Sequence, residues 1–215
     1  MFTGIIEDVA RISDIRKLTG KWEIYIHTNL NPHGIREGDS IAIDGVCLTA
    51  AVVTKDGFRA DASLETLRVT TLMEKKSGDF ANMERAMASD GRFGGHIVMG
   101  HVDGVGFIRD ISESGDSLRF DIETSPNVAR YIVRKGSVTL DGVSLTVNER
   151  NDTLFTVNII PYTASKTAIG GKKLRDKMNI ETDIIGKYIE SLMKEGKGGG
   201  VDMRFLYEHG YIKGD

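Results

Sequence analysis

The chain has 215 residues, of which 40% are apolar and 27% charged, a composition typical of a soluble globular protein. The formal net charge of −3 and the pI near 6.0 give no broad basic surface, which argues against nucleic acid as a partner. No apolar run approaches the roughly 18 residues of a membrane helix. The single cysteine and the lack of signal-peptide features at the N-terminus favour a cytoplasmic protein.

The first half of the chain has the pattern of six short strands joined by tight turns. Apolar and polar residues alternate through Trp22–Thr28, as they do in a half-buried strand. Asn31-Pro32 is a typical helix start, and Asp56-Gly57 is typical of a hairpin turn. The patterns predict strands at 5–12, 22–28, 40–43, 48–54, 58–62 and 79–85, with a short helix from Ser63 to about Leu72.

The second half repeats the first. Asp44–Thr49 reads Asp-Gly-Val-Cys-Leu-Thr and returns 97 residues later as Asp141–Thr146, where Ser144 replaces Cys47. Other pairs in matching order are Asn31-Pro32 with Ser125-Pro126, Glu37-Gly38 with Lys135-Gly136, Asp61 with Asn158, Thr66 with Thr163, and Asn82 with Asn179. The repeat indicates two duplicated domains of ordinary size.

A glycine-rich join separates the copies, and we place the domain boundary between Ala88 and Gly94. Six short strands with tight turns in each half indicate a small closed barrel, which leaves no exposed sheet edge. We therefore expect an all-β fold of two tandem six-stranded antiparallel barrels of Greek-key type, with short helices and a C-terminal α-helix. The predicted boundaries are 1–90 and 91–184 for the barrels, 185–197 for the helix and 198–215 for the tail.

The predicted C-terminal helix starts at Asp183, which can cap it, and runs to about Glu195. Its apolar residues form one stripe at helical spacing: Ile184, Ile185, Tyr188, Ile189, Leu192 and Met193. Periodicity alone fits a contact between subunits and packing on the chain's own domain equally well.

Cys47 and two histidines are the first candidates for chemistry. A cysteine is more often a small buried residue than a nucleophile, but Cys47 follows a glycine turn in a duplicated motif. His96 and His101 lie five residues apart and would face opposite sides of a strand, which disfavours a shared metal ion. Each histidine stays a candidate for acid–base chemistry or ligand contact. The duplicated Thr49 and Thr146 favour two similar polar pockets.

Five motifs, spread in order over both halves, resemble those of one known family. They are Met1–Ile6, Gly45–Thr49, the Gly-Gly-His-x-x-x-Gly-His segment at 94–101, Asp141–Thr146 and Asn158–Thr163. Taken together they strongly resemble riboflavin synthase of the alpha-chain type, over about residues 1 to 195.

The resemblance implies two lumazine-binding barrels, a homotrimer assembled by the C-terminal helix, and no metal or organic cofactor. It also implies a transferase reaction, the last step of riboflavin biosynthesis. Two molecules of 6,7-dimethyl-8-ribityllumazine dismutate by four-carbon transfer, giving riboflavin and 5-amino-6-ribitylamino-uracil. In the family the two pockets face each other between neighbouring subunits, which holds both substrates in reacting geometry. Association with lumazine synthase stays open.

The resemblance also implies the site residues. For the first pocket they are Gly4, Ile5, Ile6, Cys47, Leu48, Thr49, Asp61, Ala62, Ser63, Leu64, Glu65 and Thr66. For the second they are Gly100, His101, Val102, Lys135, Ser144, Leu145, Thr146, Asn158, Ile159, Ile160, Pro161, Tyr162 and Thr163. Cys47, Ser144 and His101 are the expected catalytic residues, because the reaction removes a proton from the C7 methyl of one lumazine and adds a nucleophile at C7 of the other. Lys135 is expected to stabilise negative charge.

Two alternative functions fit the same barrels. A non-catalytic lumazine-binding antenna protein keeps one competent pocket, whereas here the second copy retains Ser144, Thr146, Asn158 and Thr163 beside Cys47 in the first. A flavin-binding barrel of a reductase shares the general fold, but two tandem copies without a nicotinamide domain count against it. The enzyme is the preferred interpretation.

Overall fold

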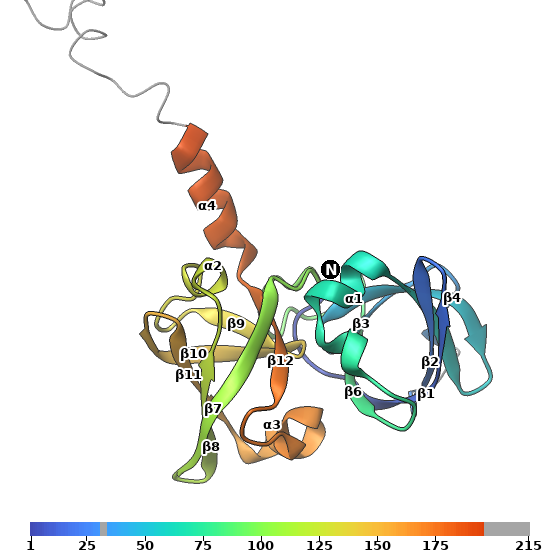
Figure 1. Cartoon of the computed structure of the whole chain (residues 1–215), viewed down its shortest axis with the longest axis horizontal. Helices are drawn as coiled ribbons and strands as arrows, with labels where there is room; N and C mark the ends of the chain where they lie inside the picture. The colour runs from blue at the N-terminus through green and yellow to red at the C-terminus, as the bar shows by residue number, and fades with distance from the viewer. Residues whose placement is uncertain (31–33, 196–215) are drawn as a thin grey trace, which may run out of the picture. The chain divides into compact units, whose positions relative to one another are not determined.

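Two closed antiparallel barrels of six strands each make up the unit Met1–Asp183, in a computed structural model that describes residues 1–30 and 34–195 (Figure 1). The first barrel has the circular order β1-β2-β5-β4-β3-β6 and the second β10-β11-β8-β7-β12-β9, which is the same order with each strand number raised by six. The strands of the first barrel are β1 (Asp8–Leu18), β2 (Lys21–His27), β3 (Ser40–Ile43), β4 (Val46–Thr54), β5 (Gly57–Ser63) and β6 (Phe80–Arg85). Those of the second are β7 (Gly104–Ser114), β8 (Ser117–Glu123), β9 (Ser137–Leu140), β10 (Val143–Asn151), β11 (Leu154–Ile159) and β12 (Lys177–Thr182). The predicted all-β class and the duplicated barrels are confirmed.

The helices are short, apart from the last. They are α1 (Leu64–Val69), η2 (Thr71–Glu74), α2 (Pro126–Ala129), α3 (Pro161–Lys166), η3 (Ala168–Gly171) and α4 (Ile184–Glu195). The helix predicted from Ser63 to Leu72 breaks in two at Thr70, which takes an extended conformation and caps η2 through its side chain. The helix start at Asn31-Pro32 and the tail 198–215 lie outside the described residues. Among those described, none of the helices has the length and apolar character needed to cross a membrane.

Strand alternation divides each duplicated motif between the core and the outside. Val46, Leu48 and Ala50 point into the first barrel and are buried, whereas Cys47 and Thr49 alternate with them and point outward. The second barrel repeats this division along β10. Cys47 and Thr49, and Ser144 and Thr146 in the second copy, therefore lie on the outer wall of a barrel, whereas Asp44 and Asp141 are buried.

The two Asp-Gly turns of the repeat meet where the barrels join. Asp44 and Gly45 have φ of 45° and 77°, and Asp141 and Gly142 have φ of 45° and 80°, as in two-residue hairpin turns of type I′. The turns touch, because a Cβ on Gly45 would lie only 2.7 Å from the Gly142 nitrogen. Gly45 and Gly142 are thus required for two reasons: the positive φ of the turn, and the lack of space for a side chain.

Two buried asparagines lock this joint by crossing it. The Asn82 backbone N–H donates to Asp44 Oδ1 at 2.8 Å, while the Asn82 side-chain amide donates to the Asp141 carbonyl of the other barrel at 2.9 Å. The Asn82 Oδ1 accepts a bond of 2.7 Å from the Ala168 N–H, also in the other barrel. Asn179 makes the equivalent three bonds in the reverse direction, at 2.7, 2.9 and 2.8 Å.

Each turn aspartate is also paired with a lysine. Lys75 Nζ lies 2.7 Å from Asp44 Oδ2, and Lys172 Nζ lies 2.7 Å from Asp141 Oδ2. Burial, and then the neighbouring Asp44 carboxylate, raise the pKa of Asp141 to about 6. The joint therefore contains charged groups, but its geometry is set by backbone and amide hydrogen bonds.

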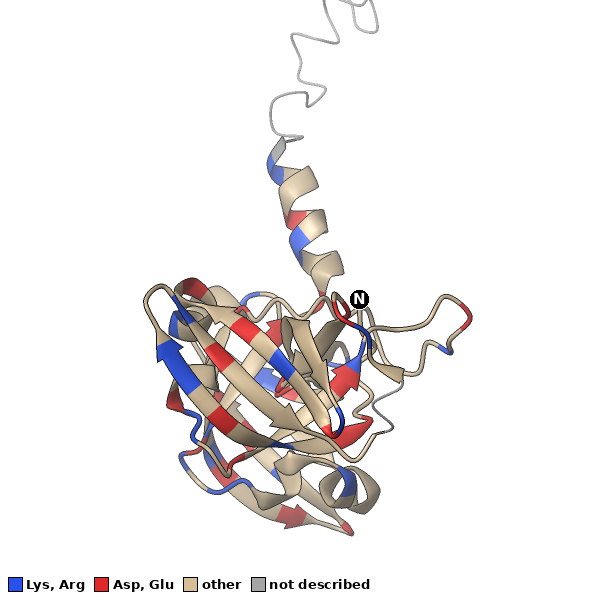
Figure 2. Ribbon diagram, turned by 90° about the vertical axis from the view of Figure 1, so that its right-hand side faces the viewer, with Lys and Arg blue, Asp and Glu red and all other residues tan. Residues whose placement is uncertain are grey.

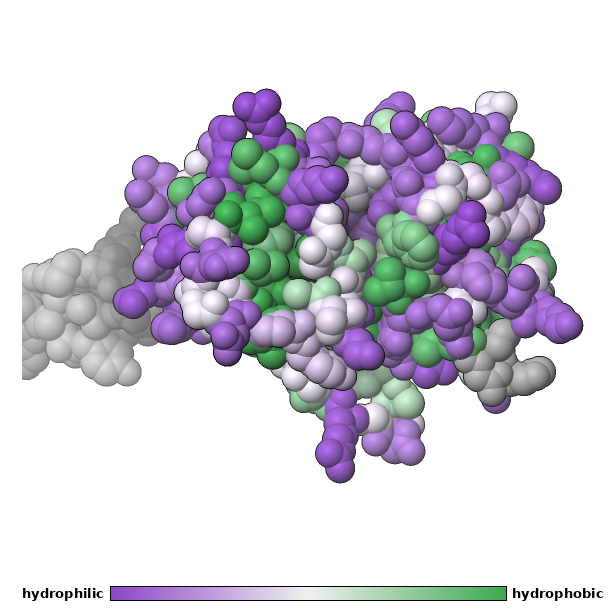
Figure 3. All heavy atoms as spheres, turned by 90° about the horizontal axis from the view of Figure 1, so that it is seen from below, coloured by the Kyte–Doolittle hydropathy of each residue, from purple (hydrophilic) through white to green (hydrophobic). Residues whose placement is uncertain are grey.

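The surface mixes charges of both signs. Figure 2 shows Lys and Arg interspersed with Asp and Glu along the strands, and the face in Figure 3 shows hydrophobic patches between hydrophilic residues. In the view of Figure 2 no broad basic area appears, in line with the net charge of −3.

We predict that Gly45→Ala destabilises the protein much more than Gly20→Ala. Both glycines have φ near +80°, but the space around Gly20 is open, whereas the Gly45 position faces the Gly142 backbone. The backbone angle alone should cost about 1 kcal/mol, and the added overlap should bring Gly45→Ala to about 3 kcal/mol. Urea unfolding of both variants tests this, and equal losses of stability would contradict the contact between the turns.

Candidate functional site

The outward residues of the first barrel form a polar row across three strands. Thr49 on β4 lies opposite Ser40 on β3 and opposite Asp61 on β5, and Cys47 lies opposite Ala42. Asp61 is held by an ion pair of 2.6 Å from its Oδ2 to Lys21 Nζ. The sheet register thus brings Thr49 and Asp61 together, although they belong to different segments of the sequence.

The second barrel presents a corresponding face on β9, β10 and β11. Ser144 lies opposite Thr139, and Thr146 lies opposite Ser137. Thr146 and Asn158 are exposed, and Ser144 is half-buried. Both barrels therefore carry hydroxyl-rich faces built on equivalent strands.

The remaining predicted site residues differ in their exposure. Exposed residues are Ile5, Ser63, Leu64, Glu65, His101, Lys135, Ile160, Pro161 and Tyr162. Half-buried residues are Ile6, Thr66, Val102 and Thr163. Residues buried in the wall or core are Gly4, Leu48, Ala62, Gly100, Leu145 and Ile159, which can offer a ligand chiefly their backbone atoms.

The segments that lead into the two barrels cross over to the opposite barrel. The Gly4 carbonyl accepts a bond of 2.8 Å from the Ser144 N–H, and the Gly100 carbonyl accepts one of 2.9 Å from the Cys47 N–H. In the same way Ile6 packs on the core of the second barrel and Val102 on the core of the first. Gly4 and Ile6, grouped by sequence with Cys47, thus contact the second barrel.

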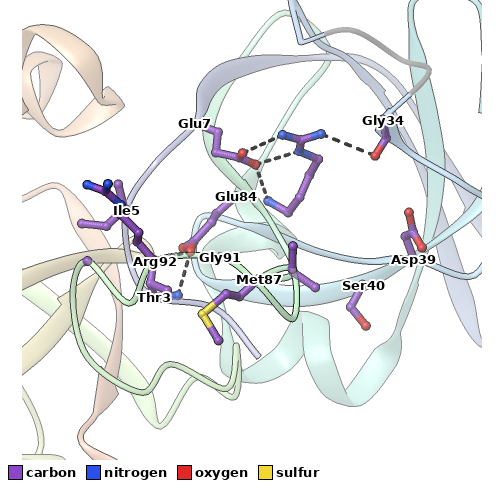
Figure 4. A pocket seen from close by; sticks show the side chains of 14 residues that line it. Thr3, Ile5, Glu7, Gly34, Asp39, Ser40, Glu84, Met87, Gly91 and Arg92 are labelled. Atoms are coloured by element: carbon purple, nitrogen blue, oxygen red, sulfur yellow. Dashed lines mark hydrogen bonds and ion pairs between the residues drawn. The ribbon is translucent and has the colours of Figure 1, made fainter.

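A cleft of about 720 Å³ adjoins the polar row of the first barrel (Figure 4). Its volume falls within the range of small-molecule sites. Ser40, the register neighbour of Thr49, lines it together with Ile5. The other lining residues are Thr3, Glu7, Gly34, Asp39, Glu84, Arg85, Ala86, Met87, Ala88, Gly91, Arg92 and Gly94.

A bidentate ion pair forms part of the cleft wall. Arg85 Nη2 and Nε lie 2.8 and 2.9 Å from the two carboxylate oxygens of Glu7. The hydrogen bonds from Arg85 lower the pKa of Glu7, so this carboxylate is charged at neutral pH. At the equivalent place in the second barrel, Asp103 accepts bonds of 2.8 Å from the backbone N–H and the hydroxyl of Thr182. Thr182 therefore takes the place of Arg85 as a donor to the equivalent carboxylate.

His96 is the histidine that the fold places against a predicted catalytic residue. Its Nδ1 lies 2.8 Å from the Ser144 hydroxyl oxygen, and its Nε2 is buried with no hydrogen-bond partner among the described residues. Burial lowers the pKa of His96, and the carboxylate of Asp183 partly opposes this effect. A neutral imidazole beside a hydroxyl is an arrangement suited to proton transfer.

His101, which sequence reasoning preferred, is exposed and has no described contact with Ser144. The sequence signal for His96 was the pair of glycines before it. A Cβ on Gly95 would lie 2.0 Å from the Thr3 carbonyl oxygen and 3.1 Å from the Ser144 Cβ, so only glycine lets this backbone come so close. That close approach brings the His96 ring to Ser144.

Lys135 occupies a backbone conformation that favours glycine. Its φ is +66°, and at the equivalent position the first barrel has Gly38 with φ of +91°. The backbone bonds match as well, because Gly38 N–H donates to the Ala50 carbonyl and Lys135 N–H to the Val147 carbonyl. The alignment of Glu37-Gly38 with Lys135-Gly136 was therefore wrong by one residue, and Lys135 is equivalent to Gly38. A lysine held at such a position is a candidate functional residue.

We predict that His96 titrates below the ordinary histidine value of 6.5 and that Asp183→Asn lowers its pKa further. Burial disfavours the imidazolium, and the Asp183 carboxylate favours it. An NMR pH titration of the histidine ring protons measures both effects. Asp116→Asn, in the exposed β7–β8 turn, serves as the control and should leave the His96 value unchanged. A higher pKa in Asp183→Asn would contradict the prediction.

Comparison with known proteins agrees with this architecture. Residues 3–86 and 99–183 each match the lumazine binding domain family. The riboflavin synthase of Actinobacillus pleuropneumoniae is 47% identical over 193 residues, which cover 90% of this chain and 90% of that protein. The riboflavin synthase of Bacillus subtilis is 38% identical over 215 residues, covering 98% and 100%.

The fold is also found in a crystal structure of LumP complexed with riboflavin. Its TM-score is 0.78 at 23% identity, and the match covers 85% of this chain and 99% of that one. This likeness concerns the fold, whereas the matches to the synthases extend along nearly the whole sequence at much higher identity. The chain belongs to the riboflavin synthase family and contains two lumazine-binding domains.

Proposed function

We propose that this chain makes riboflavin by the dismutation of two molecules of 6,7-dimethyl-8-ribityllumazine, with 5-amino-6-ribitylamino-uracil as the second product. The observation that carries the proposal is the polar outer face that both barrels keep on equivalent strands, with Thr49 matched by Thr146 and Cys47 by Ser144. A protein that only binds one ligand needs one such face. A reaction between two identical molecules needs two.

Ser144 and His96 form the proposed proton-transfer pair. The neutral imidazole can accept a proton through Nδ1 from the hydroxyl 2.8 Å away, or relay one to a substrate. In this role the pair either activates the hydroxyl or a water for addition at C7, or takes the proton of the C7 methyl. His96 thereby joins Cys47, Ser144 and His101 as a proposed catalytic residue.

Cys47 is proposed to act at the other face. Its half-buried side chain points outward from β4, next to the exposed Thr49. It would contact the ring of the second lumazine as a nucleophile or as a support for added water. Exposed Lys135 and His101 would stabilise negative charge that develops in the reaction.

The remaining predicted residues are proposed to bind the substrates. Hydroxyls of Thr49, Thr66, Thr146 and Thr163 suit hydrogen bonds to the ribityl chain or to the ring edge. Exposed backbone groups around Asn158 suit the pyrimidine. Binding two substrates in register converts a bimolecular reaction into one within a complex, which can supply much of the rate enhancement.

We further propose that the chain acts as a homotrimer in the cytoplasm. Within α4, Tyr188, Ile189, Leu192 and Met193 are more than half exposed and lie on one side of the helix. An apolar stripe of this kind is suited to helix–helix contacts between copies. Assembly would bring the first-barrel face of one copy against the second-barrel face of another.

We expect the purified protein to convert 6,7-dimethyl-8-ribityllumazine to riboflavin with no added metal or nucleotide, one riboflavin per two lumazines. Ser144→Ala and His96→Gln should each lower kcat about a hundredfold, because each removes half of the proton-transfer pair. The kcat of His101→Gln shows how much the second histidine contributes relative to His96. His27→Gln, at an exposed position of β2, is the matched control and should leave kcat unchanged. Absorbance and riboflavin fluorescence report turnover. Stoichiometric binding without turnover would leave a lumazine-binding protein instead.

We expect the wild-type chain to sediment at about three times the mass of one chain. The double variant Tyr188→Glu/Leu192→Glu should sediment as a single chain and lose turnover, because charges on the stripe oppose its burial between copies. Lys194→Glu, on the opposite side of α4, provides the control. A double variant that keeps its mass and activity would rule out assembly through this helix.

A further inference from the structure

Two buried carboxylates outside the proposed catalytic set occupy equivalent positions in the two barrels. Glu84 lies on β6 and Glu181 on β12, 97 residues apart, and they are 5% and 3% exposed. Burying a carboxylate is unfavourable unless hydrogen bonds compensate its lost hydration. Their retention at both positions therefore calls for a function.

Each carboxylate binds two successive backbone N–H groups. Glu84 accepts bonds of 2.7 Å from the Thr3 N–H and 2.9 Å from the Gly4 N–H, and it also accepts the Thr3 hydroxyl at 2.9 Å (Figure 4). Glu181 accepts bonds of 2.7 Å from the Met99 N–H and 2.9 Å from the Gly100 N–H. Hydrogen bonds to a charged acceptor are stronger than neutral ones, so they fix both backbone segments firmly.

The segments held in this way are the ones that cross between the barrels. Phe2 and Val98 pair with each other, with an N–H to carbonyl bond of 2.7 Å from Phe2 to Val98. Beyond this pair, the Gly4 carbonyl receives the Ser144 N–H, and the Gly100 carbonyl receives the Cys47 N–H. Each carboxylate is thus linked through a single glycine, Gly4 or Gly100, to a proposed catalytic residue of the other barrel.

The contacts of Glu84 extend to the histidine. Thr3, which Glu84 holds through two hydrogen bonds, accepts a bond of 3.1 Å from the His96 N–H at its carbonyl. His96 in turn contacts the Ser144 hydroxyl. Displacing Thr3 and Gly4 would therefore disturb both members of the proposed proton-transfer pair.

We propose that Glu84 and Glu181 are positioning residues that act crosswise, Glu84 of the first barrel fixing Ser144 and His96, and Glu181 of the second barrel fixing Cys47. This positioning role requires no contact between either carboxylate and a substrate. Each carboxylate holds a glycine residue in place. The carbonyl of that glycine accepts the N–H of Ser144 on β10 or of Cys47 on β4 and so fixes the position of the strand. The catalytic consequence rests on the proposed function, whereas the crosswise contacts do not.

The single cysteine makes the proposal measurable without substrate. In Glu181→Gln an amide group replaces one carboxylate oxygen and opposes a backbone N–H, so the Gly100 contact with Cys47 should loosen. We expect alkylation of Cys47 by iodoacetamide to change about fivefold or more, the factor that corresponds to one hydrogen bond. Glu84→Gln should leave the alkylation rate within about twofold and should instead shift the His96 ring signals in NMR spectra.

Thr3→Val supplies a milder variant that removes one bond to Glu84 and leaves the backbone bonds in place. It should shift the His96 signals in the same direction as Glu84→Gln and leave the Cys47 rate unchanged. Glu84→Asp and Glu181→Asp keep the charge and should restore part of each effect. Thr3→Val also keeps the test decisive if a Gln variant does not fold.

Two outcomes would overturn the proposal. One is the reverse pattern, in which Glu84→Gln alters Cys47 and Glu181→Gln alters His96. The other is an equal change at both sites in both variants, which would indicate a general loss of packing. In turnover, both Gln variants should lower kcat more than they raise KM. The crosswise thiol and NMR pattern without riboflavin formation in the wild type would uphold the positioning role and reject the proposed activity.

Discussion

The contact between the Asp44-Gly45 and Asp141-Gly142 turns determines how the two barrels are related. Gly45 and Gly142 touch at backbone distance, and Asn82 and Asn179 each hydrogen bond across the joint. Both asparagine side chains are almost fully buried, so every bond they make replaces one to water. Because the bonds are reciprocal, the barrels are related by an approximate two-fold axis at this joint.

The two barrels therefore have equivalent backbones, in which a few side chains differ. Cys47 in the first barrel is replaced by Ser144 in the second, and Gly38 is replaced by Lys135. The Arg85 partner of Glu7 is replaced by Thr182, which donates to Asp103. The backbone around these positions is the same in both barrels. A duplicated frame with divergent side chains suits a reaction in which two identical molecules have different roles.

The barrels were predictable because their determinants are local. Strand alternation, Asp-Gly turns and the 97-residue repeat are all visible within short windows. The crossing of Gly4 to Ser144 and the contact of His96 with Ser144 depend on residues 140 and 48 positions apart, and no short pattern encodes them. The break at Thr70 was missed for a related reason, because the Thr71 N–H there bonds the Asn179 side chain of the other barrel, a contact that no local pattern encodes.

The crossing segments also decide which groups remain for chemistry. The N–H groups of Cys47 and Ser144 are both occupied, by the Gly100 and Gly4 carbonyls, so neither is available to stabilise a developing anion. Negative charge on a bound lumazine must then be met by side chains or by N–H groups elsewhere. Lys135 of the second barrel is held at a left-handed position, where glycine would be easier to accommodate, and in the proposed mechanism it is one such side chain. The hydrogen bonds that fix β4 and β10 to the crossing segments therefore leave charge stabilisation, in the proposed mechanism, to exposed side chains such as Lys135.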